Sequence, residues 1–191
     1  ETGMAMGFVG NSRPASGSEH HVSHYWEMKF LFAHHAPVFH GTKVGLATPG
    51  VIAMWKKLAR DGIDFAACAW EAMVLDRFEA AVPGVLALEE KAGKNDIEAA
   101  LKRIDIMEEK WPDIQAVIEQ ELPQPEEVTA ILKSVEAPYR PMQVGIDEAM
   151  TRDGVILAKE VRVRYGLLQL LWDLGLLEDY STAFVAYYRN N

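Results

Sequence analysis

Apolar residues recur at helical spacing along this chain, and that periodicity constrains its fold more than any other feature. One stripe repeats at i, i+4, i+7 and i+10 and another at i, i+3, i+4 and i+7, each on an otherwise charged background. The stripes are Ile97, Leu101, Ile104 and Met107, then Val128, Ile131, Leu132 and Val135. Strand signals are almost absent, because no short run alternates cleanly between apolar and polar residues and is bounded by hairpin turns. The pattern predicts an all-α chain in which both stripes pack on a common core.

Glycine and proline divide the periodic sequence into about eight to ten helices. The predicted helices span roughly residues 16–33, 41–60, 64–81, 84–92, 96–110, 112–121, 125–136, 147–163, 167–174 and 177–188. Ser16 and Glu19 match the S-x-x-E capping box, so we expect Ser16 to cap the first long helix. Pro49 interrupts the segment 41–60, which is therefore either one kinked helix or a helix that starts anew near residue 48.

Length and composition limit the kind of protein that these helices form. A chain of 191 residues that is 49% hydrophobic can bury one substantial core, and no internal repeat or linker divides it. The net charge of −9 repels a phosphate backbone, which argues against nucleic acid as a partner. Neither a membrane-spanning apolar run nor a signal peptide is present, so no membrane span is expected. The single cysteine, Cys68, cannot form an internal disulfide, and we expect a buried thiol in a cytoplasmic protein.

All six histidines of the chain lie between positions 20 and 40. His20 and His24 are four residues apart and share one helix face, whereas His21 points about 100° away. His40 precedes a glycine at the head of the next predicted helix and can approach the same point. An i,i+4 imidazole pair suits one metal ion, but spacing alone leaves metal-binding and structural roles open for these three residues. The remaining histidines, His21, His34 and His35, are expected to be exposed or to cap helices.

The amino-acid sequence of the histidine-rich segment resembles that of a known family. The stretch "GFVGNSRPASGSEHHVSHYWEM", followed by "FHGTKVGLAT", resembles the bacterial type of sn-glycerol-1-phosphate dehydrogenase, within the iron-containing alcohol dehydrogenase and dehydroquinate synthase-like superfamily. The segment "AKEVRVRYGLLQLLWDLGLL" at 158–177 is similar to the C-terminal segment of that family. The resemblance extends over most of the chain, and residues 84–125 are its least characteristic part.

The resemblance implies specific roles for three histidines. The histidine directly after the "SGSE" element, His20, is a metal ligand in the family, and the histidine of the following His-Gly pair, His40, is a second ligand. His24 contacts the substrate and has a catalytic role beside the ion. The ion is zinc or nickel in the family, and histidine-rich ligation suits either metal.

The resemblance also implies what lies outside this chain. Members carry an N-terminal nucleotide-binding domain that binds NAD(P), and an aspartate upstream serves as a third metal ligand. Neither has a counterpart here, because Gly7 and Gly10 do not form a G-x-G-x-x-G turn between a strand and a helix. We therefore expect residues 1–191 to be one helical metal- and substrate-binding domain, the C-terminal part of a two-domain enzyme.

The expected reaction interconverts dihydroxyacetone phosphate and sn-glycerol 1-phosphate, with a small phosphorylated polyol as substrate. The missing N-terminal domain is the expected partner, and the face that it would cover is expected to favour homo-oligomers when left exposed. Two alternatives remain open at this point. One is a glycerol dehydrogenase or another alcohol dehydrogenase of the same superfamily, and the other is a non-catalytic helical binding or oligomerisation module.

Overall fold

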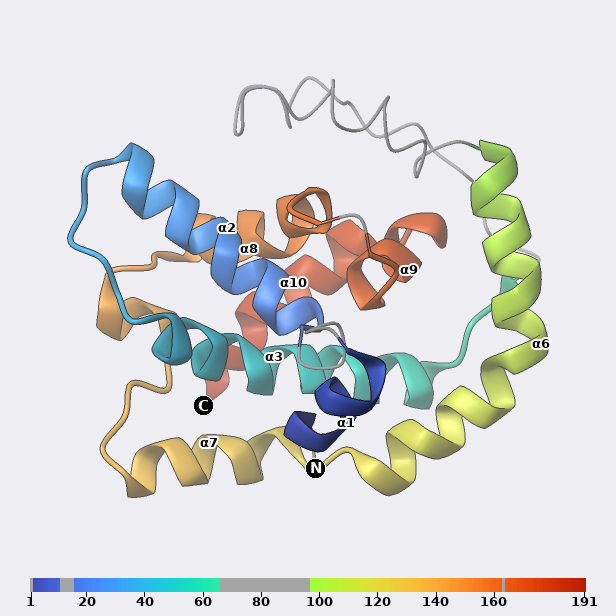
Figure 1. Ribbon diagram of the computed structural model, residues 1–191, viewed down its shortest axis with the longest axis horizontal. Helices are drawn as coiled ribbons and strands as arrows, with labels where there is room; N and C mark the ends of the chain where they lie inside the picture. Colours follow the sequence, from blue (N-terminus) through green and yellow to red (C-terminus); the bar gives the residue numbers. More distant parts are fainter. Residues whose placement is uncertain (1, 11–15, 66–96, 163) are drawn as a thin grey trace.

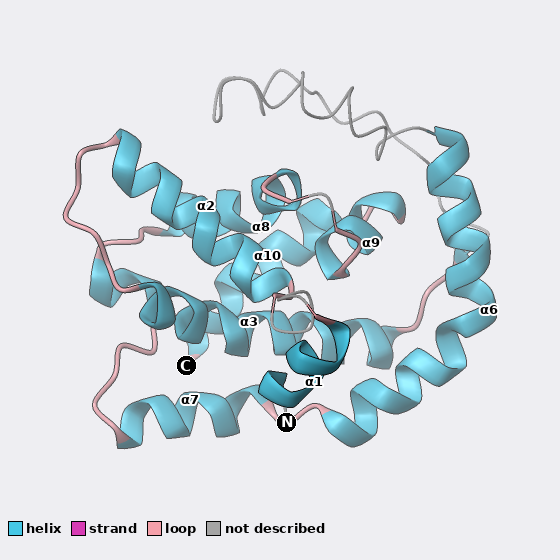
Figure 2. Ribbon diagram, viewed as in Figure 1, coloured by secondary structure: helices cyan, strands magenta, loops and turns pink. Residues whose placement is uncertain are grey.

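The computed structural model describes residues 2–10, 16–65, 97–162 and 164–191, and every regular element in these ranges is helical (Figure 2). The elements are α1 (Thr2–Val9), α2 (Ser18–Phe32), α3 (His40–Asp61), α6 (Ile97–Glu121), α7 (Pro125–Ser134), η3 (Pro141–Val144), α8 (Glu148–Leu157), η4 (Ala158–Glu160), α9 (Leu167–Asp173) and α10 (Leu177–Asn190). The all-α prediction is confirmed for this part of the chain. Cys68, the predicted helix 84–92 and nearly all of the predicted helix 64–81 lie outside the described residues.

Helix α3 is the element around which the others are arranged. It packs against α2, α10, α7 and α6, and Figure 1 shows α2 and α7 on opposite sides of it. Helix α8 packs in turn against α2 and α10. Helices α2 and α3 are thereby each held by several neighbours, which gives their side chains a rigid support.

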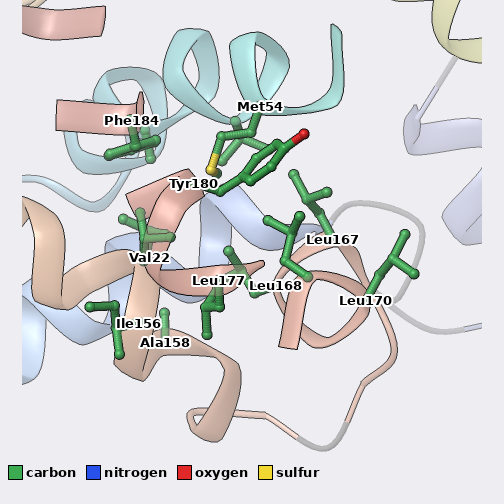
Figure 3. Close-up of a cluster of buried hydrophobic side chains, with 14 of the residues drawn as sticks. Val22, Met54, Ile156, Ala158, Leu167, Leu168, Leu170, Leu177, Tyr180 and Phe184 are labelled. Carbon is green, nitrogen blue, oxygen red and sulfur yellow. The ribbon is translucent and has the colours of Figure 1, made fainter. Parts of the chain in front are cut away.

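Buried side chains from α2, α3, α9 and α10 form one continuous core (Figure 3). Val22 of α2 and Phe184 of α10 are fully buried, and Met54 of α3 and Leu177 of α10 are nearly so. Burying a large apolar side chain of this kind stabilises the folded state by about 1.5–3 kcal/mol. The core therefore fixes α2 against α3 and α10.

Two glycines allow helices to approach closely within this core. A Cβ atom at Gly50 of α3 would lie 2.3 Å from Cε2 of Phe184, and one at Gly154 of α8 would lie 2.6 Å from Nε1 of Trp26. The same contacts carry hydrogen bonds, because the Gly50 N–H donates to the Tyr188 hydroxyl at 3.2 Å and the Trp26 indole donates to a backbone carbonyl of α8 at 3.0 Å. A side chain at either position would force these helices apart.

Prolines interrupt the helices less than the sequence suggests. Pro49 lies inside a single helix, α3, so the helix does not start anew near residue 48. Pro112 also lies inside one helix, α6, which corrects the predicted division into 96–110 and 112–121. Packing compensates for the missing hydrogen bond, since Trp111 and Ile118 on either side of Pro112 are buried. Figure 1 shows that α6 changes direction along its length.

The two apolar stripes are only partly buried, which corrects the expectation that both pack on a common core. Ile104 and Met107 of α6 are buried, but Leu101 is 52% exposed. In and after α7, Ile131 and Val135 are more than 60% exposed. Within this stripe, Leu132 is the residue that packs α7 against α3. Its Cδ2 would lie 3.6 Å from a Cβ at Gly45.

Several helix ends differ from prediction. Gly17, rather than Ser16, is the N-cap of α2, and its N–H donates to the Glu19 carboxylate at 3.0 Å. The predicted helix 147–163 continues as α-helix only to residue 157, and a 3₁₀ turn follows at 158–160. Of the helices that the structure describes, none combines the length and the apolar character needed to cross a membrane.

Candidate metal centre

Three of the predicted site residues converge where the first turns of α2 meet the start of α3. His20 and His24 lie on α2, and His40 is the first residue of α3. The ring centroids are 5.2 Å apart for His20 and His40, 5.0 Å for His24 and His40, and 6.3 Å for His20 and His24. Packing of α2 on α3 thus produces a cluster of three imidazoles from two separate segments.

The donor atoms around this cluster suit a divalent transition metal. Among the described residues, one ligand atom each from His24, Glu27 and His40 lies within 4.8 Å of the other two. Imidazole and carboxylate are among the ligands that zinc and nickel accept in proteins. His20 lies outside this tightest set. Its ring centroid nevertheless lies 5.2 Å from that of His40, compared with 5.0 Å for the His24 ring. The geometry therefore offers two overlapping ligand sets that share His40. One set contains His24 and Glu27, and the other contains His20.

Glu27 has another partner that bears on its suitability as a ligand. The ammonium group of Lys43 lies 3.5 Å from Glu27 Oε1, and the Lys43 side chain is only 1% exposed. A cation bound to Glu27 would lie beside this buried positive charge, and like charges repel. The Lys43 charge therefore disfavours Glu27 as a metal ligand and favours the set that contains His20.

A carboxylate also supports His20. Glu19 Oε1 lies 3.1 Å from His20 Nδ1. An ionised carboxylate only accepts hydrogen bonds, so in a neutral His20 ring this contact places the ring proton on Nδ1 and leaves the lone pair on Nε2. Metal-bound histidines usually donate their second ring N–H to an acceptor of this kind. Glu19 thus provides His20 with the outer partner that a ligand histidine needs.

His24 is held in its neutral form. Its partial burial is the largest effect and lowers the pKa of the imidazole. The hydrogen bond with Glu27 opposes this shift, while the neighbouring His40 and Arg162 reinforce it, and the net pKa stays below the ordinary value. At neutral pH the His24 ring can therefore accept a proton or a hydrogen bond.

The other three histidines lie outside the cluster. His21 is 4% exposed, so the expectation of an exposed or capping residue is wrong, because its face of α2 is buried against neighbouring helices. His34 and His35 are exposed as predicted and lie just after the C-terminus of α2. The His35 ring contacts the Phe30 ring edge-on, with centroids 5.5 Å apart.

Sequence reasoning missed three charged residues around the cluster: Glu27, Lys43 and Arg162. Glu27 follows His24 by three positions and Lys43 follows His40 by three, which places each on the same helix face as a histidine. That spacing could have identified both. Arg162 comes from a distant part of the sequence, and no local pattern connects it with the histidines.

Taken together, the fold and the site define a helical domain with a histidine-rich candidate metal centre between two of its helices. The sequence is 31% identical over 179 residues to "Glycerol-1-phosphate dehydrogenase [NAD(P)+]" of Geobacillus thermodenitrificans, and the match covers 93% of this chain. The protein of the same name from Geobacillus stearothermophilus matches to the same extent. A third, from Halalkalibacterium halodurans, is 51% identical over 63 residues, or 33% of this chain. These relatives confirm the resemblance carried by the histidine-rich segment.

The chain spans about 38% of the length of the two Geobacillus relatives. No protein-family model matches the chain, and no solved structure gives a significant match.

Proposed function

We propose that residues 1–191 form the metal- and substrate-binding part of an NAD(P)-linked oxidoreductase that interconverts dihydroxyacetone phosphate and sn-glycerol 1-phosphate. The observation that carries this proposal is the convergence of His20, His24 and His40 at the contact of α2 with α3. Likeness over 93% of the chain to proteins named glycerol-1-phosphate dehydrogenase supports the reaction and the NAD(P) cofactor.

His20 and His40 are the proposed ligands of one divalent ion, either zinc or nickel. Support comes from the 5.2 Å separation of their ring centroids and from the Glu19 carboxylate that fixes the His20 tautomer. The third ligand implied by the family resemblance is an aspartate outside this chain. Two neutral imidazoles alone should bind the ion weakly, because a carboxylate supplies the negative charge that strengthens such sites.

Hydride transfer at a secondary alcohol places negative charge on the substrate oxygen, and a bound divalent ion supplies Lewis-acid stabilisation of that charge. His24 is the proposed group that handles the proton. In the oxidation direction its ring accepts the hydroxyl proton while the hydride leaves carbon for NAD(P)+, and in the reduction direction it returns the proton to the carbonyl oxygen. The lowered pKa of His24 suits this role, since a neutral ring must be available at the start of oxidation.

Binding of NAD(P) is assigned mainly to a part of the enzyme outside this chain. Dinucleotide-binding folds place the pyrophosphate at a strand–turn–helix junction, and the described residues contain no strand. Positioning the nicotinamide against the substrate carbon contributes about 7–11 kcal/mol to a catalysed barrier. The isolated chain should therefore be inactive.

The test is an assay of dihydroxyacetone phosphate reduction with NADH and NADPH, in the presence of zinc or nickel. The chain is assayed alone and mixed with the part of the Geobacillus thermodenitrificans relative that lies outside the aligned stretch. We expect activity only from the mixture, loss of that activity in His24→Ala, and retention in the matched control His35→Ala, which alters an exposed histidine outside the cluster. Turnover by the chain alone, or preference of the mixture for an unphosphorylated alcohol, would contradict the proposal.

A further inference from the structure

Lys43 occupies a position that packing and solvation do not explain. Its side chain is 1% exposed, yet it carries an ammonium group into the protein interior. It also lies in the first turn of α3, where the positive end of the helix dipole disfavours a cation. Both effects cost free energy, so the charge needs compensation from nearby groups.

Two acceptors provide that compensation. The Lys43 ammonium donates to the Val38 carbonyl oxygen at 2.6 Å and lies 3.5 Å from Glu27 Oε1. The other carboxylate oxygen, Glu27 Oε2, lies 3.3 Å from Nδ1 of His24. A continuous polar chain thus runs from Lys43 on α3, through Glu27, to His24 on α2.

Glu27 is ionised within this chain. Its partial burial raises the pKa of the carboxyl, but the charge of Lys43 and the hydrogen bond with His24 outweigh burial and hold the pKa below its ordinary value. An ionised carboxylate cannot donate, so the hydrogen bond between Glu27 and His24 requires the ring proton on Nδ1.

We propose that Lys43 is a positioning residue, which anchors the Glu27 carboxylate so that Glu27 holds His24 as its Nδ1–H tautomer with Nε2 unprotonated. This inference rests on the function proposed for His24, since only a ring with a free Nε2 can accept the substrate hydroxyl proton through that atom. Lys43 has a second effect, because its charge keeps the bound cation away from Glu27. The pair of residues thereby separates proton handling by His24 from metal ligation by His20 and His40.

The tautomer of His24 can be measured directly by nitrogen-15 NMR of the histidine-labelled chain. The sample is treated with a chelator and kept above the pH range in which imidazole is protonated. We expect Nε2 of His24 to have the chemical shift of an unprotonated ring nitrogen and Nδ1 to have that of a protonated one. Lys43→Met removes the charge and keeps most of the apolar stem, so Nδ1–H should cease to be the dominant form. A matched lysine of the same helix, Lys57, pairs with Asp61, and Lys57→Met should leave the tautomer unchanged.

The role of Glu27 as intermediary gives a second, independent expectation. Glu27→Ala should abolish the Nδ1–H preference, and adding Lys43→Met to it should change nothing further, because Lys43 acts only through the carboxylate. Glu27 is half exposed, so the alanine variant should fold. Lys43→Gln, which retains a donor for the Val38 carbonyl, replaces Lys43→Met if circular dichroism shows lost helix.

A folded Lys43 variant that keeps the wild-type tautomer would overturn the proposal, as would a further shift in the double variant. The measurement needs neither metal, substrate nor activity. A failed enzyme assay would therefore contradict the proposed function without affecting the tautomer result. An unchanged tautomer in the Lys43 variant would contradict the role of Lys43 without affecting the proposed function.

Discussion

The imidazole rings of His20 and His40 come from different helices, yet their centroids lie 5.2 Å apart. If both bind one ion, His20→Ala and His40→Ala should each lower the affinity for zinc or nickel. The loss should exceed the roughly 10- to 100-fold typical of losing an outer-shell partner. Isothermal titration of the metal-free chain measures this affinity. His24→Ala should keep most of the affinity, and equal loss in all three variants would make His24 a ligand as well.

Glu27→Gln discriminates between the two overlapping ligand sets. Because the Glu27 carboxylate faces Lys43, we expect the substitution to change metal affinity by no more than about threefold, the size of a screened charge effect. Glu19→Ala should weaken binding by at least about tenfold, since it removes the acceptor that orients His20. The reverse order of effects in the same titration would identify His24, Glu27 and His40 as the ligands.

Gly50→Ala tests the close contact of α3 with α10. The new Cβ would lie 2.3 Å from a Phe184 ring carbon, so the free energy of unfolding should fall by about 1–3 kcal/mol. Gly45→Ala is the matched control on the same helix, because its Cβ meets only Leu132 at an ordinary 3.6 Å. Helix propensity should raise the stability of that variant by roughly 0.5–1 kcal/mol. Urea unfolding compares the two, and equal stabilities would show that the helices separate without cost.

Alkaline pH should unfold the chain. Burial raises the pKa of Tyr180 to about 12, and it holds the pKa of Tyr25, Tyr165 and Tyr188 still further above the ordinary range. The folded state favours the neutral phenols, so this stabilisation is complete below the unfolded pKa of about 10 and is lost as pH rises beyond it. Tyrosinate absorbance should therefore appear late and together with loss of helix. Ionisation of these phenols near the ordinary pKa in a chain that remains folded would contradict the burial.

Periodicity and turn residues predicted most helices of the described part of the chain, because amphipathic faces are encoded locally. The short helix α1 (Thr2–Val9) was not predicted. Periodicity and turn residues failed where tertiary packing decides the outcome. Pro112 stays within α6 because buried side chains on both sides hold the helix to the core. Val135 was predicted to be buried from its spacing, yet it lies at the exposed end of α7, and spacing alone cannot tell which of several apolar residues meets a neighbour.

The candidate site was predictable to the extent that its residues share one short segment. His20, His24 and His40 come together as the family resemblance implies, although their roles as ligand and substrate contact stay predictions. Lys43 was missed because a lysine near a helix start normally lies in solvent. Only the packing of α2 on α3 shows that its ammonium is buried against Glu27.

The position of a bound ion decides whether His20 and His40 are its ligands. Crystals of the chain soaked in zinc, with diffraction recorded on both sides of the zinc absorption edge, locate the metal by anomalous difference density. We predict a peak between the His20 and His40 rings, with Glu19 behind His20 and no contact to Glu27. A peak held by Glu27 and His24, or no peak at the cluster while zinc occupies other surface sites, would contradict this prediction.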